Sequence, residues 1–122
     1  MNPMTFEDLE SWQKARLLVQ KVYQLTRNSE LCRDFGICDQ LQRAGVSIMS
    51  NIAEGFERSH LQEKLQFYNV ARGSAAEGRS LSYVVEDNFP ESASACAVLR
   101  GETIAAGKLV SGLVRSTERR KV

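Results

Sequence analysis

Residue types that build most catalytic and metal sites are scarce in this chain of 122 residues. It contains one histidine, His60, and three cysteines, Cys32, Cys38 and Cys96, without the paired spacing of a zinc site. His60 would begin the third predicted helix and Cys38 the second, so they would lie too far apart for nucleophile and base. No glycine-rich phosphate loop occurs, and none of the predicted helices contains a Glu-x-x-His motif that could face the inside of the bundle. We therefore expect no metal, no cofactor and no enzymatic activity.

The chain also lacks a signal peptide and a long apolar run. An odd number of cysteines without such a segment is typical of reduced thiols. We expect a cytoplasmic protein that does not enter a membrane. The net charge of +1 argues against an avid, sequence-independent nucleic-acid binder.

Proline and aromatic residues are rare, and this favours helices. The two prolines, Pro3 and Pro90, leave residues 4–89 free of helix breakers. Ala, Leu, Gln, Glu and Arg are frequent, and the apolar content of 43% is ordinary for a globular protein. Residues 1–122 are predicted to form a single all-α domain.

Four helices are predicted, at about 6–27, 36–55, 60–87 and 91–118, followed by a frayed basic tail. Their short connections favour an antiparallel, up-down-up-down four-helix bundle. Thr5 and Ser59 are predicted to cap the first and third helices, each at the start of a capping-box pattern. Gly55 is predicted to end the second helix in the left-handed conformation, and Pro90 opens the fourth.

The second helix carries an apolar stripe and a polar stripe side by side. The apolar stripe is Ile37, Leu41, Ala44, Ile48 and Ile52; the polar stripe is Arg43, Ser47, Asn51, Glu54 and Arg58. An antiparallel hairpin would place Arg43 near Ser74 and Glu77 of the third helix. We predict an Arg43–Glu77 ion pair and a hydrogen bond from Asn51 at the edge of the bundle. Polar residues of this kind more often fix register than perform chemistry.

The C-terminal end is rich in basic residues, and two interpretations remain open. Arg115, Arg119, Arg120 and Lys121 are candidates for contacts with nucleic-acid phosphates. Alternatively, the charges favour the end of the last helix and are neutralised by acidic residues at the same end of the bundle. These acids are Glu7, Asp8, Glu10, Glu54 and Glu57.

Apolar residues outside the main stripes indicate self-association. They are Tyr23, Val46, Met49, Phe56, Tyr68, Val70, Tyr83 and Val84. A wide apolar stripe in a stout monomer is the alternative.

The motif Ser50-Asn51-Ile52-Ala53-Glu54-Gly55, preceded by Gln40-Leu41-Gln42-Arg43-Ala44 and Ser47-Ile48, resembles a known family. It is similar to the small four-helix-bundle proteins encoded in intervening sequences of 23S ribosomal RNA genes. Weaker matches are Phe6, Leu9, Trp12, Lys14 and Ala15, then Ala71, Gly73, Ser74 and Glu77. Gly78 departs from the family pattern, which usually has leucine there.

The resemblance implies a ring-like homo-oligomer, typically a homopentamer, without a catalytic site. Related proteins include the accessory variability determinant of diversity-generating retroelements, which binds a reverse transcriptase and nucleic acid. That relative is markedly basic, whereas this chain is nearly neutral.

Our first hypothesis is a non-enzymatic, cytosolic assembly module that acts as an accessory to RNA or to a nucleic-acid enzyme. The alternative is a protein–protein adaptor or scaffold without nucleic-acid contact. A third is an enzyme with an unrecognised acid–base site. Salt-sensitive RNA binding separates the first two.

Overall fold

The computed structural model describes residues 3–28 and 30–120, and the regular structure in that part of the chain is entirely helical. The α-helices are α1 (Glu10–Thr26), α2 (Phe35–Glu57), α3 (Leu61–Asn88) and α4 (Ala93–Arg119). Short 3-10 turns precede three of them: η1 (Phe6–Asp8), η2 (Leu31–Arg33) and η3 (Pro90–Ser92). The prediction of an all-α protein with four helices is confirmed.

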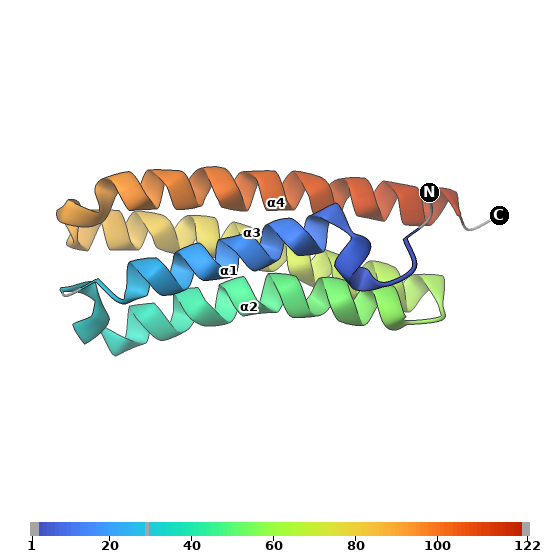
Figure 1. Ribbon diagram of the computed structural model, residues 1–122, viewed down its shortest axis with the longest axis horizontal. Helices are drawn as coiled ribbons and strands as arrows, with labels where there is room; N and C mark the ends of the chain where they lie inside the picture. The colour runs from blue at the N-terminus through green and yellow to red at the C-terminus, as the bar shows by residue number, and fades with distance from the viewer. Residues whose placement is uncertain (1–2, 29, 121–122) are drawn as a thin grey trace.

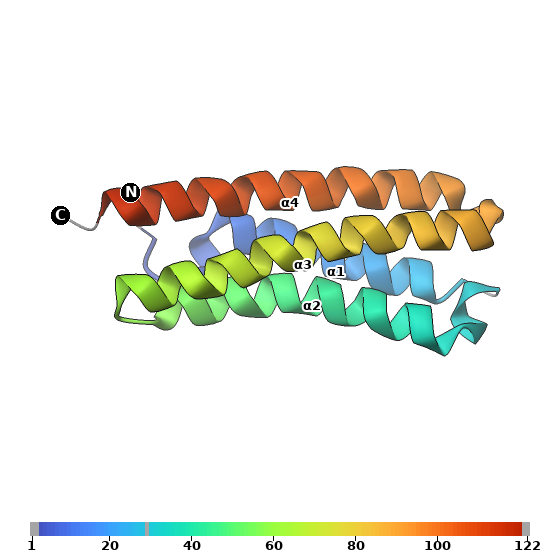
Figure 2. The ribbon, with the colours of Figure 1, turned by 180° about the vertical axis from the view of Figure 1, so that it is seen from behind.

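The helices lie side by side, and consecutive helices run in opposite directions along the long axis (Figure 1). The contacts between α2 and α3 follow this arrangement. Gly55 lies against Phe67 and Tyr68 near the start of α3, whereas Ser47, earlier in α2, contacts Ser74. α1 and α3 each pack against both α2 and α4, and Figure 2 shows α3 on the side opposite to α1. Both ends of the chain lie at the same end of the molecule.

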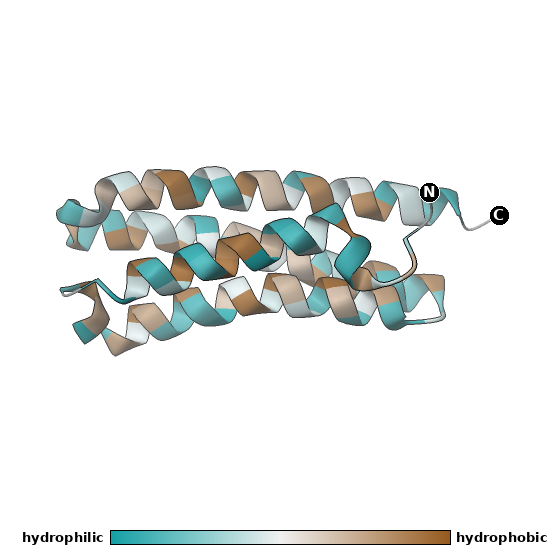
Figure 3. Ribbon diagram, viewed as in Figure 1, coloured by the Kyte–Doolittle hydropathy of each residue, from teal (hydrophilic) through white to brown (hydrophobic). Residues whose placement is uncertain are grey.

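Each helix buries one side, as its spacing of apolar residues requires. The buried apolar residues include Ala15, Leu18 and Val22 of α1, Leu41, Ile48 and Ile52 of α2, Tyr68, Ala71 and Val85 of α3, and Leu99, Ala106 and Val110 of α4. Figure 3 shows apolar and polar segments alternating along α1 and α2. The core therefore runs the length of the molecule between all four helices.

The first helix begins later than the sequence predicts. Thr5 and Asp8 do form a capping box, but it closes the η1 turn rather than α1. The Asp8 carboxylate accepts hydrogen bonds from the backbone N–H groups of Met4 and Thr5, and these bonds lower the pKa of Asp8. Leu9 is extended (φ −76°, ψ 128°), which separates η1 from α1.

The prediction for Gly55 is wrong. α2 continues past it to Glu57, and no described glycine has a positive φ. Gly55 is instead buried beneath the ring of Tyr68: a Cβ atom there would lie 2.5 Å from Tyr68 Cε1. The glycine is required for a close approach of helices and not for a left-handed cap.

The α2–α3 turn is also closed differently from the prediction. The N-cap of α3 is His60, without a side-chain capping bond, and Ser59 precedes it. Helix α3 is held to the end of α2 by Lys64, whose ammonium group donates to the carbonyl oxygen of Phe56 at 2.7 Å. A cation that binds the last carbonyl groups of a helix stabilises its C-terminus.

Three of the apolar residues expected outside the core are not on the surface. Tyr68 is only 1% exposed, and Met49 and Phe56 are half-buried and pack against the core. The others remain exposed: Tyr23, Val46, Val70, Tyr83 and Val84. Three of these exposed residues, Val70, Tyr83 and Val84, lie on α3. The apolar surface also includes large side chains that the sequence did not predict there: Met4, Leu17, Phe35, Val98 and Ile104.

Candidate functional site

A short polar network joins α2 to α3 near the middle of the molecule. The hydroxyl groups of Ser47 and Ser74 lie 2.7 Å apart, and Ser74 is 8% exposed. The Asn51 amide donates to the Ser47 carbonyl oxygen at 2.8 Å and to the Ser47 hydroxyl at 3.0 Å. The predicted hydrogen bond of Asn51 is thus present. Because the network is satisfied within the protein, it fixes the pairing of the two helices.

The charged members of the predicted polar stripe do not join this network. Arg43, Glu54 and Glu77 are exposed, and the ion pairs among the described residues do not include an Arg43–Glu77 pair. Arg58 is also exposed and lies over the ring of Phe67, 4.7 Å from its centroid. The prediction of this ion pair is wrong. Exposed charged groups gain little free energy by pairing, so the Arg43 guanidinium and the Glu77 carboxylate stay in water.

The basic residues predicted near the C-terminus lie at the end of α4 and just after it. Arg115 and Arg119 are exposed, Arg120 follows α4 directly, and Lys121 lies outside the described residues. The ion pairs among the described residues include Lys14–Glu102, Lys21–Glu102 and Arg100–Glu86, all away from this end.

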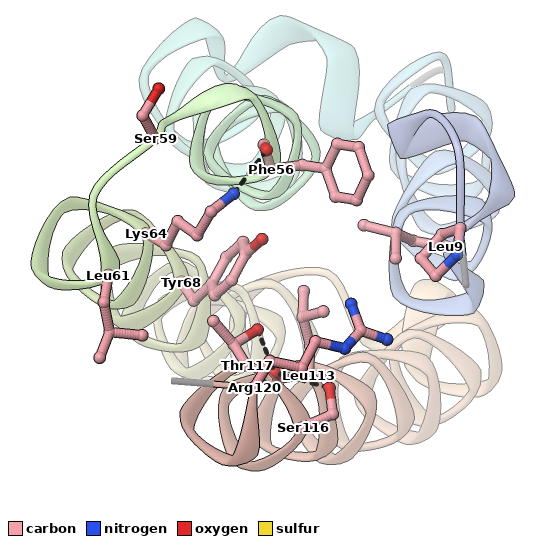
Figure 4. Close-up of a pocket in the computed structure, with 11 residues that line it drawn as sticks. Leu9, Phe56, Ser59, Leu61, Lys64, Tyr68, Leu113, Ser116, Thr117 and Arg120 are labelled. Atoms are coloured by element: carbon pink, nitrogen blue, oxygen red, sulfur yellow. Dashed lines mark hydrogen bonds between the residues drawn. The ribbon is translucent and has the colours of Figure 1, made fainter. Parts of the chain in front are cut away.

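A cavity of about 460 Å³ opens at this end of the bundle, where η1, the α2–α3 turn and the end of α4 meet. Figure 4 looks into it: the Tyr68 hydroxyl points toward the middle, between Phe56, Leu9 and Leu113. The residues that line it are Pro3, Leu9, Phe56, Ser59, Leu61, Lys64, Tyr68, Leu113, Ser116, Thr117 and Arg120. It therefore combines apolar walls with a phenol, two hydroxyl-bearing side chains of α4 and two cations.

Burial sets the protonation of two of these groups. It lowers the pKa of Lys64, which Glu57 partly offsets, and it raises the pKa of Tyr68 to about 12. Tyr68 therefore keeps its proton at neutral pH, so its hydroxyl group can donate one hydrogen bond and can also accept one. Sequence reasoning missed this cavity, because it placed Tyr68 on the surface.

A second basic feature runs along the shallow groove between α3 and α4. Arg72 and Arg79 of α3 and Lys108 and Arg115 of α4 line it, and all four are exposed. The Arg72 guanidinium reaches across it to the Ser111 hydroxyl at 3.3 Å. Among the described residues that line this groove there is no aspartate or glutamate. The sequence does contain the pattern that predicts this groove, because the two basic residues on each helix are seven residues apart.

The His, Cys, Asp and Glu side chains of the described residues are not arranged as a metal site or as a reactive thiol site. No group of three or more His, Cys, Asp and Glu side chains gathers there as a metal site. Cys38 and Cys96 are buried, and burial raises the pKa of both thiols. His60 is exposed at the start of α3. None of the described helices is both long and apolar enough to cross a membrane.

The fold and these surfaces define an all-α, four-helix protein with a basic groove and a basic, hollowed end. Residues 7–111 match the 23S rRNA-intervening sequence protein family, and the chain belongs to this family.

A solved structure of the S23 ribosomal protein family, a protein of unknown function from Bacteroides thetaiotaomicron, has the same fold. Its TM-score is 0.77 at 17% sequence identity, over 85% of this chain and 97% of that chain. At this identity the likeness concerns the fold alone. No curated protein sequence matches the chain.

Proposed function

We propose that this protein is a non-enzymatic, cytosolic assembly module that binds RNA or serves a nucleic-acid enzyme such as a reverse transcriptase. Its unit is the up-down-up-down bundle, and five copies form a ring-like homopentamer. The relation to accessory variability determinants, implied by the sequence motifs, is part of this proposal. The observation that carries it is the basic groove between α3 and α4.

The groove has the charge and spacing that a phosphate backbone requires. Arg72 and Arg79 are seven residues apart on α3, and Lys108 and Arg115 are seven apart on α4, which corresponds to roughly 10 Å along each helix. Arginine and lysine side chains that project from such a stripe bind phosphates without reading sequence. Because the net charge of the chain is only +1, the attraction depends on local clusters of basic residues such as this groove.

Assembly into a ring would raise the affinity for nucleic acid, which a single groove binds only weakly. Exposed apolar groups on the outward side of α3, Val70 and Val84, are 46% and 45% exposed. Patches of this kind are typical of protein–protein interfaces. A ring would present one groove per subunit to the same nucleic acid, and linked weak contacts raise the overall affinity without any new contact.

The test is light scattering of the purified protein, alone and with total bacterial RNA, at low and high salt. We expect a mass near five chains that rises with RNA at low salt and returns to its starting value at high salt, because phosphate contacts weaken steeply with salt. A mass that ignores RNA at every salt concentration contradicts the RNA role.

A charge variant makes the test specific to the groove. Arg72→Gln/Arg79→Gln should lower RNA affinity at least tenfold and flatten its salt dependence, because each lost phosphate contact removes released counterions. The matched control is Arg33→Gln/Arg43→Gln, which also removes two exposed arginines, both away from the groove. Equal loss in both variants would show that only net charge matters.

A protein–protein adaptor without nucleic-acid contact is the second candidate. The exposed apolar side chains of α3 favour it, since they suit a protein partner better than a phosphate backbone. A pentamer that is indifferent to RNA would support this function instead.

A further inference from the structure

The cavity at the end of the bundle contains the hydroxyl group of Tyr68. Tyr68 as a whole is 1% exposed, and the hydrogen bonds among the described residues do not include its hydroxyl group. The hydroxyl group points toward the middle of the cavity (Figure 4). A phenol can both donate and accept a hydrogen bond. The Tyr68 hydroxyl is therefore placed to donate to an acceptor inside the cavity.

Positive charge stands beside this donor. The Lys64 ammonium group donates to the carbonyl oxygens of Phe56 at 2.7 Å and of Gly55 at 3.4 Å. These bonds hold the ammonium group at the cavity wall, and one of its three protons remains available. Arg120 lines the same cavity from the end of α4. The donor set is suited to an anionic acceptor.

The rest of the wall is apolar. Leu9, Phe56 and Leu113 point toward the cavity from three different elements, whereas Ser59 and Leu61 lie at the rim (Figure 4). A volume of about 460 Å³ lies within the range of small-molecule sites. Inorganic phosphate would leave these walls against water, and a neutral hydrocarbon would offer the Tyr68 hydroxyl group no acceptor.

We propose that this cavity binds a small organic carboxylate with an apolar body. The carboxylate accepts hydrogen bonds from the Tyr68 hydroxyl and the Lys64 ammonium group and faces the Arg120 guanidinium. The apolar body packs between Leu9, Phe56 and Leu113. The site is separate from the groove between α3 and α4 and does not depend on RNA binding.

Three probes of one chain length separate charge from hydrophobicity: octanoate, octan-1-ol and octylammonium. Isothermal titration of the full chain should show saturable binding of octanoate at one per subunit. The neutral probe should bind at least tenfold more weakly, because a hydroxyl group accepts weaker hydrogen bonds than a carboxylate does. The cationic probe should also bind at least tenfold more weakly, because Lys64 and Arg120 carry the same charge. Equal binding of all three probes, or no saturable binding of octanoate, would overturn the proposal.

The hydroxyl is tested by Tyr68→Phe, which keeps the ring against Gly55 and removes the donor. Octanoate affinity should fall by roughly tenfold, with thermal unfolding of the empty protein little changed. The matched control is Tyr83→Phe, an exposed tyrosine far along α3, which should bind as the wild type does. Unchanged affinity in Tyr68→Phe contradicts the assignment.

A second variant keeps the proposal testable if Tyr68→Phe does not fold. Arg120 follows the last helix and is exposed, so Arg120→Gln cannot disturb the core. It should weaken octanoate and leave octan-1-ol unchanged. An equal effect on both probes would contradict recognition of the carboxylate.

Discussion

Gly55 is needed in the structure for a different physical reason from the one that the sequence predicts. A glycine near the end of a predicted helix indicates a left-handed cap, and the sequence contains nothing that distinguishes this from a close approach. In the structure the helix runs through Gly55, and the Tyr68 ring occupies the space where a side chain would be. The two roles differ in which substitution they tolerate.

We predict that Gly55→Ala destabilises the protein by about 1–3 kcal/mol. A Cβ atom would lie 2.5 Å from Cε1 and 2.8 Å from Cδ1 of Tyr68, so this buried ring would have to shift. The better helix propensity of alanine offsets part of the cost. Urea unfolding followed by circular dichroism measures the difference.

Gly45→Ala is the matched control within the same helix. Its Cβ atom would make ordinary contacts, 3.6 Å from both Leu18 Cδ2 and Val19 Cγ2. This variant should be more stable than the wild type by about 0.5–1 kcal/mol. If both variants were stabilised, the close approach at Gly55 would be refuted.

At the scale of elements, the first and last helices are joined by one carboxylate. Glu102 of α4 pairs with Lys14 of α1 at 2.6 Å and with Lys21 at 3.2 Å. The hydrogen bond from Lys14 and the second one from Lys21 lower the pKa of Glu102 below its usual value of 4.5. The contact is partly exposed, so its contribution is modest.

The pairing predicts a pH dependence of the unfolding free energy. Since the pKa of Glu102 is lower in the folded state, its contribution is complete above pH 4.5 and is lost as the pH falls through the folded pKa. Glu102→Gln should cost roughly 0.5–1 kcal/mol at pH 7. The difference from the wild type should shrink below pH 4.5.

Urea titrations at several pH values measure this difference. Glu77→Gln, which removes an exposed carboxylate in the middle of α3 that takes part in none of these ion pairs, should match the wild type throughout. A cost of Glu102→Gln that stays constant down to pH 3 would mean that the ion pair is not its cause.

The number and order of the helices could be predicted from the sequence, whereas the burial of Tyr68 could not. Tyr68 was expected outside the main apolar stripes, but it is 1% exposed, and its neighbour Phe67 is only half-buried. The middle of α3 is Ala, Ser and Gly, which give a weak hydrophobic period. Without that period the cavity around Tyr68 could not be located, although Lys64 and Arg120 were both visible as charges.

At the scale of the whole molecule, α3 carries some of the apolar groups that a single bundle leaves exposed, among them Val70 and Val84. We predict that Val70→Glu/Val84→Glu lowers the mass of the assembly, because a buried interface tolerates added carboxylates poorly. Both side chains are nearly half exposed in the single chain, so helix content should not change. Light scattering and circular dichroism measure the two quantities.

Gln20→Glu controls for added charge, because it changes an exposed polar residue on α1. It should leave the mass unaltered. Rings use two different patches on each subunit, so loss of the α3 patch alone should yield single chains. An unchanged mass in the α3 variant would place the interface elsewhere.

The α2–α3 pair is fastened at two separate points along its length. Near the turn, the Tyr68 ring sits on Gly55; further along, the hydroxyl groups of Ser47 and Ser74 lie 2.7 Å apart. One contact would let the two helices rotate about it, whereas two separate contacts oppose both rotation and sliding of one helix along the other. The relative position of α2 and α3 is therefore fixed both near their turn and in the middle of the molecule.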